Sequence, residues 1–274
     1  MSAKPTQPRM VVAVDGSASS TAAVRWAAHD AALRGLTISL LHADSSPIAR
    51  LLSTESRHGT DEILEAAAAI VADIVGGSAS AVAREVRTGH PVDVIVEQSK
   101  TADIVVVGFR GNGVLGQHLL GPVSEGVLHH AHCPVAVVRA QEKNPAAADA
   151  AVLVGVDGTA TSDRAIALAF EEAQLRSVPL VAVHGCGDDP EDRSDASALL
   201  QSVLTPWQSR YPGVEVQPIV TTDRPAAELI NRTESAQLVV VGSHGRGGFA
   251  GMLLGSVSSA VVRSVDIPVI VARS

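Results

Sequence analysis

The stretch LVVVGSHGRGGFAGMLLGSVS, residues 238–258, is a run of apolar residues followed by a glycine-rich segment. Gly242 ends the apolar run, and Gly245 follows after two intervening residues. Gly255 follows after nine more residues and is itself followed by Ser256. The same layout occurs once earlier, at Gly108, Gly111 and Gly121-Pro122. Because glycine lets backbone N–H groups approach a ligand closely, the segment indicates a binding loop. One chain therefore carries two versions of this loop, and only the second ends in a hydroxyl.

A second similarity indicates that the loops belong to two copies of a whole domain. VVAVDGSASSTAAVRWAAHDAALRG at 11–35 matches VLVGVDGTATSDRAIALAFEEAQLRS at 152–177, which aligns Asp15 with Asp157. A repeat of this length is a complete domain and not a solenoid unit. The segment between the copies, AQEKNPAAADA, has the Ala, Pro and polar content of a linker. We expect a disordered tail, a first domain, a linker and a second domain over residues 1–9, 10–140, 141–150 and 151–274.

Within each copy, apolar runs alternate with amphipathic stretches, as in a parallel sheet covered by helices. The first copy predicts strands near 10–14, 37–42, 82–87, 103–107 and 134–139. It predicts helices near 18–34, 60–75, 91–101 and 122–131. We expect an α/β fold of two tandem Rossmann-like domains, each with a five-stranded parallel sheet in the order 3-2-1-4-5 flanked by helices. A ligand crevice then opens at the carboxyl ends of strands 1 and 4, where the chain reverses direction.

The composition excludes several classes of function. A net charge of −8 and an aromatic content of 2% argue against nucleic-acid binding. No apolar run reaches the roughly 18 residues that a membrane span needs. No lysine lies in either glycine loop, so the chain is not a P-loop NTPase. Cys133 and Cys186 are too few and too far apart for a disulfide framework, which predicts a cytoplasmic protein.

The expected crevice brings the aspartate after strand 1 next to the glycine loop after strand 4. In the second copy, Gly255-Ser256 begins a helix whose free N–H groups and positive dipole end favour an anion. The hydroxyls of Ser256 and Ser258 can donate to phosphate oxygens, and Arg246 adds positive charge. Asp157 repels phosphates directly, so three roles stay open for it: acceptor for ribose hydroxyls, anchor for adenine or backbone, or ligand of Mg²⁺ through water.

An alternative is that the glycines only make tight turns and that Asp15 and Asp157 cap helices. The coincidence of strand, aspartate, glycine loop and helix start in both copies favours nucleotide binding instead. The first copy departs from the second because Pro122 removes both a hydroxyl and an N–H at the helix start. Arg110 can compensate in part, and Ser124 keeps its hydroxyl. The first copy is therefore expected to be a weaker or an empty site.

The combination of D-G-S or D-G-T after strand 1 with G-x2-G-x9-G-S after strand 4 resembles the universal stress protein family in its tandem form. The resemblance implies five-stranded α/β domains, ATP bound at the crevice, and pairing of domains along the last strand. In the second copy it implies, together with Arg246 from the charge argument, ATP-binding positions at Asp157, Gly185, Gly242, Gly245, Gly255, Ser256 and Ser258. In the first copy the corresponding positions, with Arg110, are Asp15, Ala43, Gly108, Gly111, Gly121 and Ser124.

These observations predict an ATP-binding universal stress protein with a stress-response or regulatory role through nucleotide-dependent interactions. We assign no catalytic residue and no direct metal ligand, and expect Mg²⁺ to arrive with the phosphates. The expected partners are adenine nucleotide, a second copy of the chain and a protein that the sequence does not identify, with no nucleic acid and no membrane. Two alternatives remain: a slow metal-dependent ATPase in which Asp157 positions metal or water, and a scaffold whose repeat serves dimerisation alone.

Overall fold

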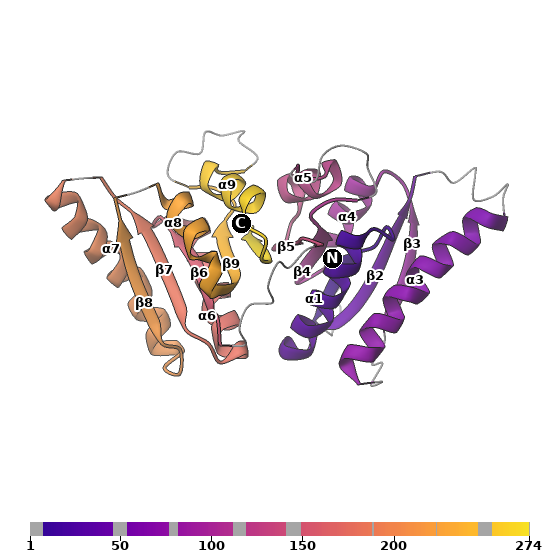
Figure 1. Ribbon diagram of the computed structural model, residues 1–274, viewed down its shortest axis with the longest axis horizontal. Coiled ribbons are helices and arrows are strands. Elements are labelled where there is room, and N and C mark those ends of the chain that lie inside the picture. The colour runs from indigo at the N-terminus through magenta and orange to yellow at the C-terminus, as the bar shows by residue number, and fades with distance from the viewer. Residues whose placement is uncertain are drawn as a thin grey trace, which may run out of the picture. The chain divides into compact units, whose positions relative to one another are not determined.

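The computed structural model consists of two compact units, Met1–Gln141 and Glu142–Ser274 (Figure 1). The residues that it describes are 8–45, 54–76, 82–111, 119–140, 149–187, 189–222, 224–245 and 254–273. Residues 1–7 of the expected tail and 141–148 of the expected linker lie outside this part of the chain. Arg9, which the sequence assigns to the tail, is the first residue of a strand.

In the first unit, strands and helices alternate along the chain as the sequence predicts. The strands are β1 (Arg9–Ala13), β2 (Thr37–Asp44), β3 (Ala83–Thr88), β4 (Ile104–Gly108) and β5 (Val135–Val138). The helices are α1 (Ala18–Arg34), α3 (Thr54–Val75), α4 (Pro91–Ser99) and α5 (Pro122–His130). The helix expected near 60–75 begins earlier, at Thr54, and residues 54–59 contain no proline that would interrupt it.

The second unit repeats this succession of elements. Its strands are β6 (Ala151–Val156), β7 (Leu180–Gly185), β8 (Val216–Thr221), β9 (Ala236–Gly242) and β10 (Val269–Ala272). Its helices are α6 (Ala160–Arg176), α7 (Pro190–Arg210), α8 (Pro225–Asn231) and α9 (Ser256–Ser264), with a short 3₁₀ helix η1 (Arg232–Ser235) before β9. The two units are therefore built from the same order of elements.

Both units form a parallel sheet with the same strand order. In the first unit the order is β3-β2-β1-β4-β5, and in the second unit it is β8-β7-β6-β9-β10. Val11 of β1 lies opposite Ser39 of β2 on one side and Val105 of β4 on the other. The predicted order 3-2-1-4-5 and the predicted α/β class are thus confirmed in each unit.

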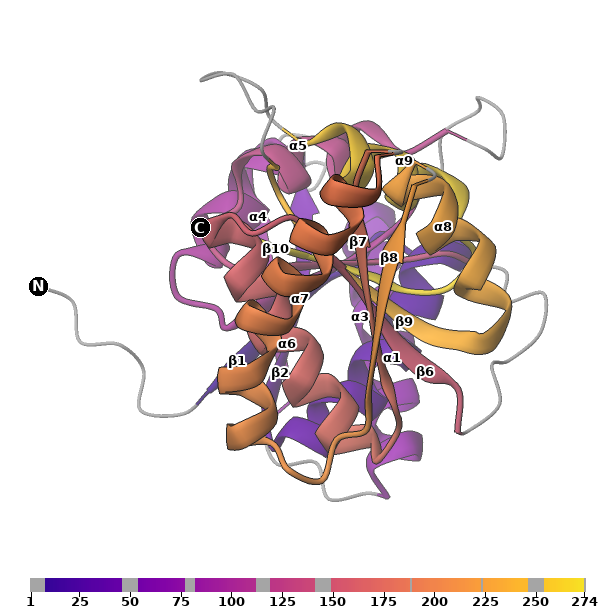
Figure 2. The ribbon, with the colours of Figure 1, turned by 90° about the vertical axis from the view of Figure 1, so that its left-hand side faces the viewer.

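Helices cover both faces of each sheet. In the first unit α1 packs on α3 and α4 packs on α5, and in the second unit α6 packs on α7 and α8 packs on α9. Figure 2 shows α6 and α7 on one side of β7 and β8, and α8 on the other. Met10, Val11 and Val12 of the inner strand β1 are completely buried, which explains why this strand is a continuous apolar run without alternation. No helix in the described part of the chain is long and apolar enough to cross a bilayer.

Short polar residues and prolines fix the points at which helices begin. Ser17 is the N-cap of α1, and its hydroxyl accepts a hydrogen bond from the N–H of Ser20 at 3.1 Å. Thr159 is the N-cap of α6 in the same way. Pro91 and Pro225 are the first residues of α4 and α8, as the sequence predicts, because a missing N–H costs nothing there.

A carboxylate on the edge strand β3 connects three neighbouring strands. Glu85 accepts hydrogen bonds from the Ser39 hydroxyl at 2.8 Å, from Arg87 at 2.9 Å and from Arg9 at 3.3 Å. Burial raises the pKa of Glu85, but the Ser39 hydrogen bond and the two guanidinium groups outweigh it and hold the pKa below its ordinary value. The fold therefore stabilises the charged form, and this stability is lost as the pH falls through the folded-state pKa.

We expect Glu85→Gln to lower the free energy of unfolding by about 1 kcal/mol at neutral pH, because it loses charge-assisted hydrogen bonds. The difference from the wild type should shrink as the pH falls below the ordinary glutamate pKa of 4.5, where the unfolded chain takes up the proton first, and it should be lost once the pH passes the lower folded-state pKa of Glu85. Denaturant melts across the acid range measure this difference. Glu65→Gln is the control, since Glu65 is exposed and lies 4.0 Å from Arg84. A difference that stays constant with pH would contradict the prediction.

Candidate functional site

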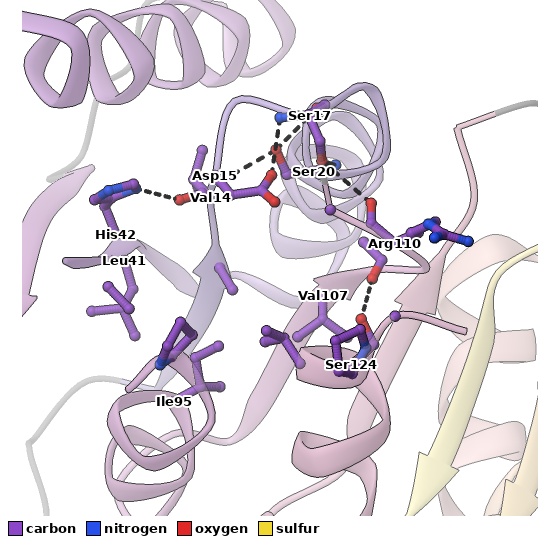
Figure 3. Close-up of a pocket in the computed structure, with 18 residues that line it drawn as sticks. Val14, Asp15, Ser17, Ser20, Leu41, His42, Ile95, Val107, Arg110 and Ser124 are labelled. Atoms are coloured by element: carbon purple, nitrogen blue, oxygen red, sulfur yellow. Dashed lines mark hydrogen bonds between the residues drawn. The ribbon is translucent and has the colours of Figure 1, made fainter. Parts of the chain in front are cut away.

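Each unit has a cavity at the carboxyl edge of its sheet, where the strand order reverses. In the first unit the reversal lies between β1 and β4, and the cavity there has a volume of about 290 Å³. Figure 3 shows that residues of β1, β2, β4 and the starts of α1, α4 and α5 surround it. The predicted residues that line it are Asp15, Ala43, Gly108, Arg110, Gly111, Gly121 and Ser124. The structure therefore brings together all seven first-copy positions.

The corresponding cavity of the second unit lies between the ends of β6 and β9. It has a volume of about 510 Å³. The predicted residues that line it are Asp157, Gly185, Gly242, Gly245, Gly255, Ser256 and Ser258. Arg246, the remaining predicted position, lies outside the described residues.

The aspartates make the turn between the first strand and the first helix of each unit. Oδ1 of Asp15 accepts a hydrogen bond from the N–H of Ser17, and Oδ1 of Asp157 accepts one from the N–H of Thr159, both at 2.9 Å. Such a turn, in which Asp bonds the N–H two residues on, is a common local role of this residue. The caps of α1 and α6 are Ser17 and Thr159, so the helix-capping role considered for the aspartates is wrong.

A histidine on the neighbouring strand fixes the carbonyl just before each aspartate. Nδ1 of His42 lies 2.8 Å from the Val14 carbonyl oxygen, and Nδ1 of His184 lies 2.6 Å from that of Val156. In Figure 3, His42 points to one side of β2 while Leu41 points to the other, toward Ile95. The histidines thus hold the strand ends in the same way in both units.

The middle glycine of each loop lies against the aspartate. A Cβ atom added to Gly245 would lie 2.7 Å from Oδ2 of Asp157, and one added to Gly111 would lie still closer to Oδ2 of Asp15. No side chain fits at either position without displacing the carboxylate. The spacing seen in the sequence therefore reflects contact between the glycine loop and the strand-1 aspartate.

The first glycine of each loop allows the helix after strand 1 to approach the end of strand 4. A Cβ atom on Gly108 would lie 2.7 Å from the backbone carbon of Ser19 and 2.8 Å from the backbone nitrogen of Ser20. A Cβ atom on Gly242 would lie 3.2 Å from the carbonyl oxygen of Thr161. The close approach puts the start of α1 or α6 directly beside the loop.

The last glycine of each loop is the N-cap of a helix. The N–H of Gly121 donates to the Phe109 carbonyl at 2.9 Å, and the N–H of Gly255 donates to the Ser243 carbonyl at 2.7 Å. These two N–H groups are therefore used within the loop. The N–H groups of Ser256 and the next two residues of α9 have no partner within the helix and can bind an anion.

The two helix starts differ in charge as well as in hydrogen-bond donors. Pro122 has no N–H to offer at the first position of α5, whereas Ser256 offers an N–H and an exposed hydroxyl. Glu125 lies in the first turn of α5, and the first turn of α9 contains no acidic residue. The sequence analysis did not consider the charge of Glu125. Its place in a first helical turn could have been inferred, because Pro122 three residues earlier marks the start of the helix. The additional N–H and hydroxyl donors and the absence of a nearby acidic residue both favour anion binding at the start of α9 over the start of α5.

The hydroxyl at the third position of each helix is engaged inside the protein. Ser258 donates to the Gly242 carbonyl at 2.5 Å, and Ser124 donates to the Gly108 carbonyl at 2.6 Å. Both serines are buried. This differs from the predicted role of Ser258 as a phosphate donor, because the single proton of its hydroxyl goes to a main-chain oxygen. Ser256 is left as the hydroxyl that faces solvent at this helix start.

Two further features of the loops did not follow from the motif. The Arg110 guanidinium donates to the Leu119 carbonyl at 3.4 Å, a long hydrogen bond across the first loop. In the second unit, the Thr161 hydroxyl donates to the His244 carbonyl at 2.8 Å. The only sign of this bond in the sequence is that Thr161 lies in the first turn of a helix beside the crevice.

The donor atoms at these sites suit an anionic ligand better than a bare metal ion. No group of three or more His, Cys, Asp and Glu side chains in the described residues is arranged to hold a metal. Asp157 is the one predicted carboxylate lining the second cavity among its described residues. A magnesium ion normally keeps several waters and binds through one or two carboxylates together with substrate phosphates.

The same features identify the family. The sequence profile described as the universal stress protein family matches residues 8–139 and 150–273. The chain belongs to the universal stress protein family. Its two units are tandem domains of that family, as the glycine spacing and the D-G-S and D-G-T turns predicted.

Relatives of similar length carry the same tandem arrangement. A universal stress protein of Mycobacterium tuberculosis is 40% identical over 284 residues, which cover 96% of each chain. A universal stress protein of Mycolicibacterium smegmatis is 41% identical over 288 residues, covering 98% of each chain. The crystal structure of a universal stress protein from Archaeoglobus fulgidus has a TM-score of 0.72 at 24% identity and covers 98% of this chain and 99% of that one. At this level of identity, the similarity to the Archaeoglobus fulgidus structure shows a shared fold.

We expect Gly108→Ala to destabilise the protein by about 1–3 kcal/mol, the usual cost of forcing extra volume into a packed site. The reason is that the new Cβ meets backbone atoms of Ser19 and Ser20, which cannot turn away. Gly213→Ala is the matched control, because a Cβ at Gly213 meets nothing within 4 Å. Thermal unfolding of both variants measures the effect, and equal melting temperatures would show that α1 does not pack as closely as described.

Proposed function

We propose that this universal stress protein binds ATP in the cavity of its second unit, with the phosphates at the start of α9. The observation that supports this most directly is the unblocked first turn of α9, which borders a cavity at the point where the strand order reverses. Three N–H groups and the Ser256 hydroxyl provide donors there, and no acidic residue lies in the first turn. A helix start of this kind favours phosphate groups.

The aspartate and the strand ends provide the other half of the proposed site. Asp157 is half-buried, and its Oδ1 already accepts two hydrogen bonds from Thr159. Its charge opposes direct contact with phosphates, so we assign it to the ribose end of the nucleotide or to water around Mg²⁺. Gly185, at the end of β7, lines the cavity and can offer backbone groups to adenine, while the space that a side chain would need there is filled by the ring of Pro225.

The first unit should bind the same ligand more weakly. Pro122 removes one donor N–H and one hydroxyl, and Glu125 already provides the negative charge that the helix start favours. We therefore propose one strong and one weak or empty site per chain. This difference in affinity between the two sites suits a regulatory role, in which ATP bound at the second site changes the interactions of the protein with its partners.

Binding without turnover is the role that the described cavity residues favour. Its titratable side chains in the described part are Asp157, His184 and His244, and each is hydrogen-bonded within the protein: Asp157 to the Thr159 N–H, His184 to the Val156 carbonyl and His244 to the Ser243 hydroxyl. No lysine lies in the loop to neutralise a leaving phosphate. A homodimer, a protein partner and a cytoplasmic location remain predictions from the sequence.

We expect Ser256→Pro to weaken ATP binding on the order of 100-fold, because it removes an N–H and a hydroxyl that each bind a charged phosphate. The fold should be retained, since Pro122 occupies the same position in the first unit. The matched change, Pro122→Ser, should strengthen or create binding in the first unit. Isothermal calorimetry measures both, and two equal sites in the wild-type protein would contradict the proposed inequality.

We expect ATP hydrolysis by the purified protein to remain at background with and without Mg²⁺, because the titratable side chains among the described cavity residues are already held in hydrogen bonds within the protein. Phosphate release, followed for the wild type and for Asp157→Ala and Gly255→Ala, tests this. Metal-dependent turnover well above background that both substitutions abolish would establish the slow ATPase instead. Failure of the wild type to bind ATP at all would favour a scaffold.

A further inference from the structure

In the second unit, hydroxyl groups connect the start of α6 to the glycine loop. Thr161, the second residue of α6, donates through its hydroxyl to the His244 carbonyl at 2.8 Å. The same hydroxyl lies 3.0 Å from that of Thr159, which donates to Oδ1 of Asp157 at 2.7 Å. These contacts join the loop, the first turn of α6 and the strand-1 aspartate in one cluster.

The bond to the His244 carbonyl also sets the direction of the next N–H. The carbonyl of His244 and the N–H of Gly245 belong to one planar trans peptide, so they point in opposite directions. With the carbonyl held toward α6 by Thr161, the Gly245 N–H points away from α6. Gly245 itself lines the cavity and lies against Oδ2 of Asp157. The orientation of this possible phosphate donor therefore depends on a side chain outside the glycine motif.

The first unit lacks this bond. Ser19 stands in the place of Thr161, and its hydroxyl has no hydrogen-bond partner in the described part of the chain. The equivalent loop carbonyl, that of Arg110, accepts instead from Ser17 at 3.4 Å, at the weak end of the hydrogen-bond range (Figure 3). The glycine loops of the two units are thus held by different residues and with different geometry.

We propose that Thr161 is a positioning residue of the second site, which orients the Gly245 N–H toward the phosphates of a bound nucleotide. This inference rests on the proposed function of the cavity and adds a residue to it that the glycine motif does not contain. A donor held in place before the ligand arrives costs less ordering on binding. Thr161 therefore contributes, together with Ser256, to the higher affinity of the second unit.

The test compares Thr161→Val, which keeps the shape of the side chain without its hydroxyl, with Thr161→Ser, which keeps the hydroxyl. By calorimetry, Thr161→Val should weaken ATP binding about tenfold, the effect of one lost hydrogen bond, and leave adenosine binding unchanged. Thr161→Ser should restore ATP binding, and the matched change Ser19→Ala should have no effect. Equal losses for ATP and adenosine would overturn the proposal, since they would mean that the cavity as a whole is disturbed.

Hydrogen exchange of the ligand-free protein tests the same role without nucleotide. Thr161→Val should raise amide exchange in peptides covering 236–245, while Thr161→Ser and Ser19→Ala should leave it unchanged. Unchanged exchange in Thr161→Val would overturn the positioning role. If the wild type does not bind ATP, the proposed function fails, and the exchange measurement still decides whether Thr161 orients the loop.

Discussion

The site depends on the close approach of the helix after strand 1 to the end of strand 4. Only glycine permits this approach at Gly108, where a Cβ would lie 2.7 Å from the backbone of Ser19. Because the helix starts so close to the neighbouring strand, the turn that carries Asp15 lies directly under the glycine loop, and Gly111 contacts its carboxylate. The reversal of strand order creates the crevice, and the close contact between Gly108 and the start of α1 places the aspartate turn and the glycine loop on either side of it.

Because the chain contains two copies of the domain, features that both units share can be compared with features that only one unit has. The shared features are those that the fold requires. The contact of the middle glycine with the aspartate occurs in both units, and so does the bond from the helix serine to the strand-end carbonyl. These shared features hold strand, loop and helix together whether or not a ligand binds. The features that differ are the start of the helix after the loop, where Pro122 and Glu125 stand in one unit and Ser256 and Ser259 in the other, and the bond from Thr161 to the loop carbonyl, which the described part of the first unit lacks.

The sequence predicted the strand order and the cavity lining because both follow from periodic patterns. Buried valine runs mark the strands, and the aspartates and glycines mark strand ends, which a parallel sheet brings to one edge. The hydrogen bonds of individual hydroxyls did not follow. Ser258 looked like a phosphate donor from its place near a helix start, but its proton goes to Gly242. Thr161 had no motif to mark it, since its bond depends on how closely α6 approaches the loop.

The choice between these hydroxyls is decided by position within the first helical turn. The residue at the first position of α9, Ser256, projects from the end of the helix and is exposed. The residue at the third position, Ser258, faces back over the end of β9, where the Gly242 carbonyl is free to accept. Ser124 repeats this geometry beside Pro122, so the third-position serine is also present in the unit that has no hydroxyl at the first position. The proposed phosphate site therefore depends on the G-S pair at the end of the motif, and the later serine belongs to the framework.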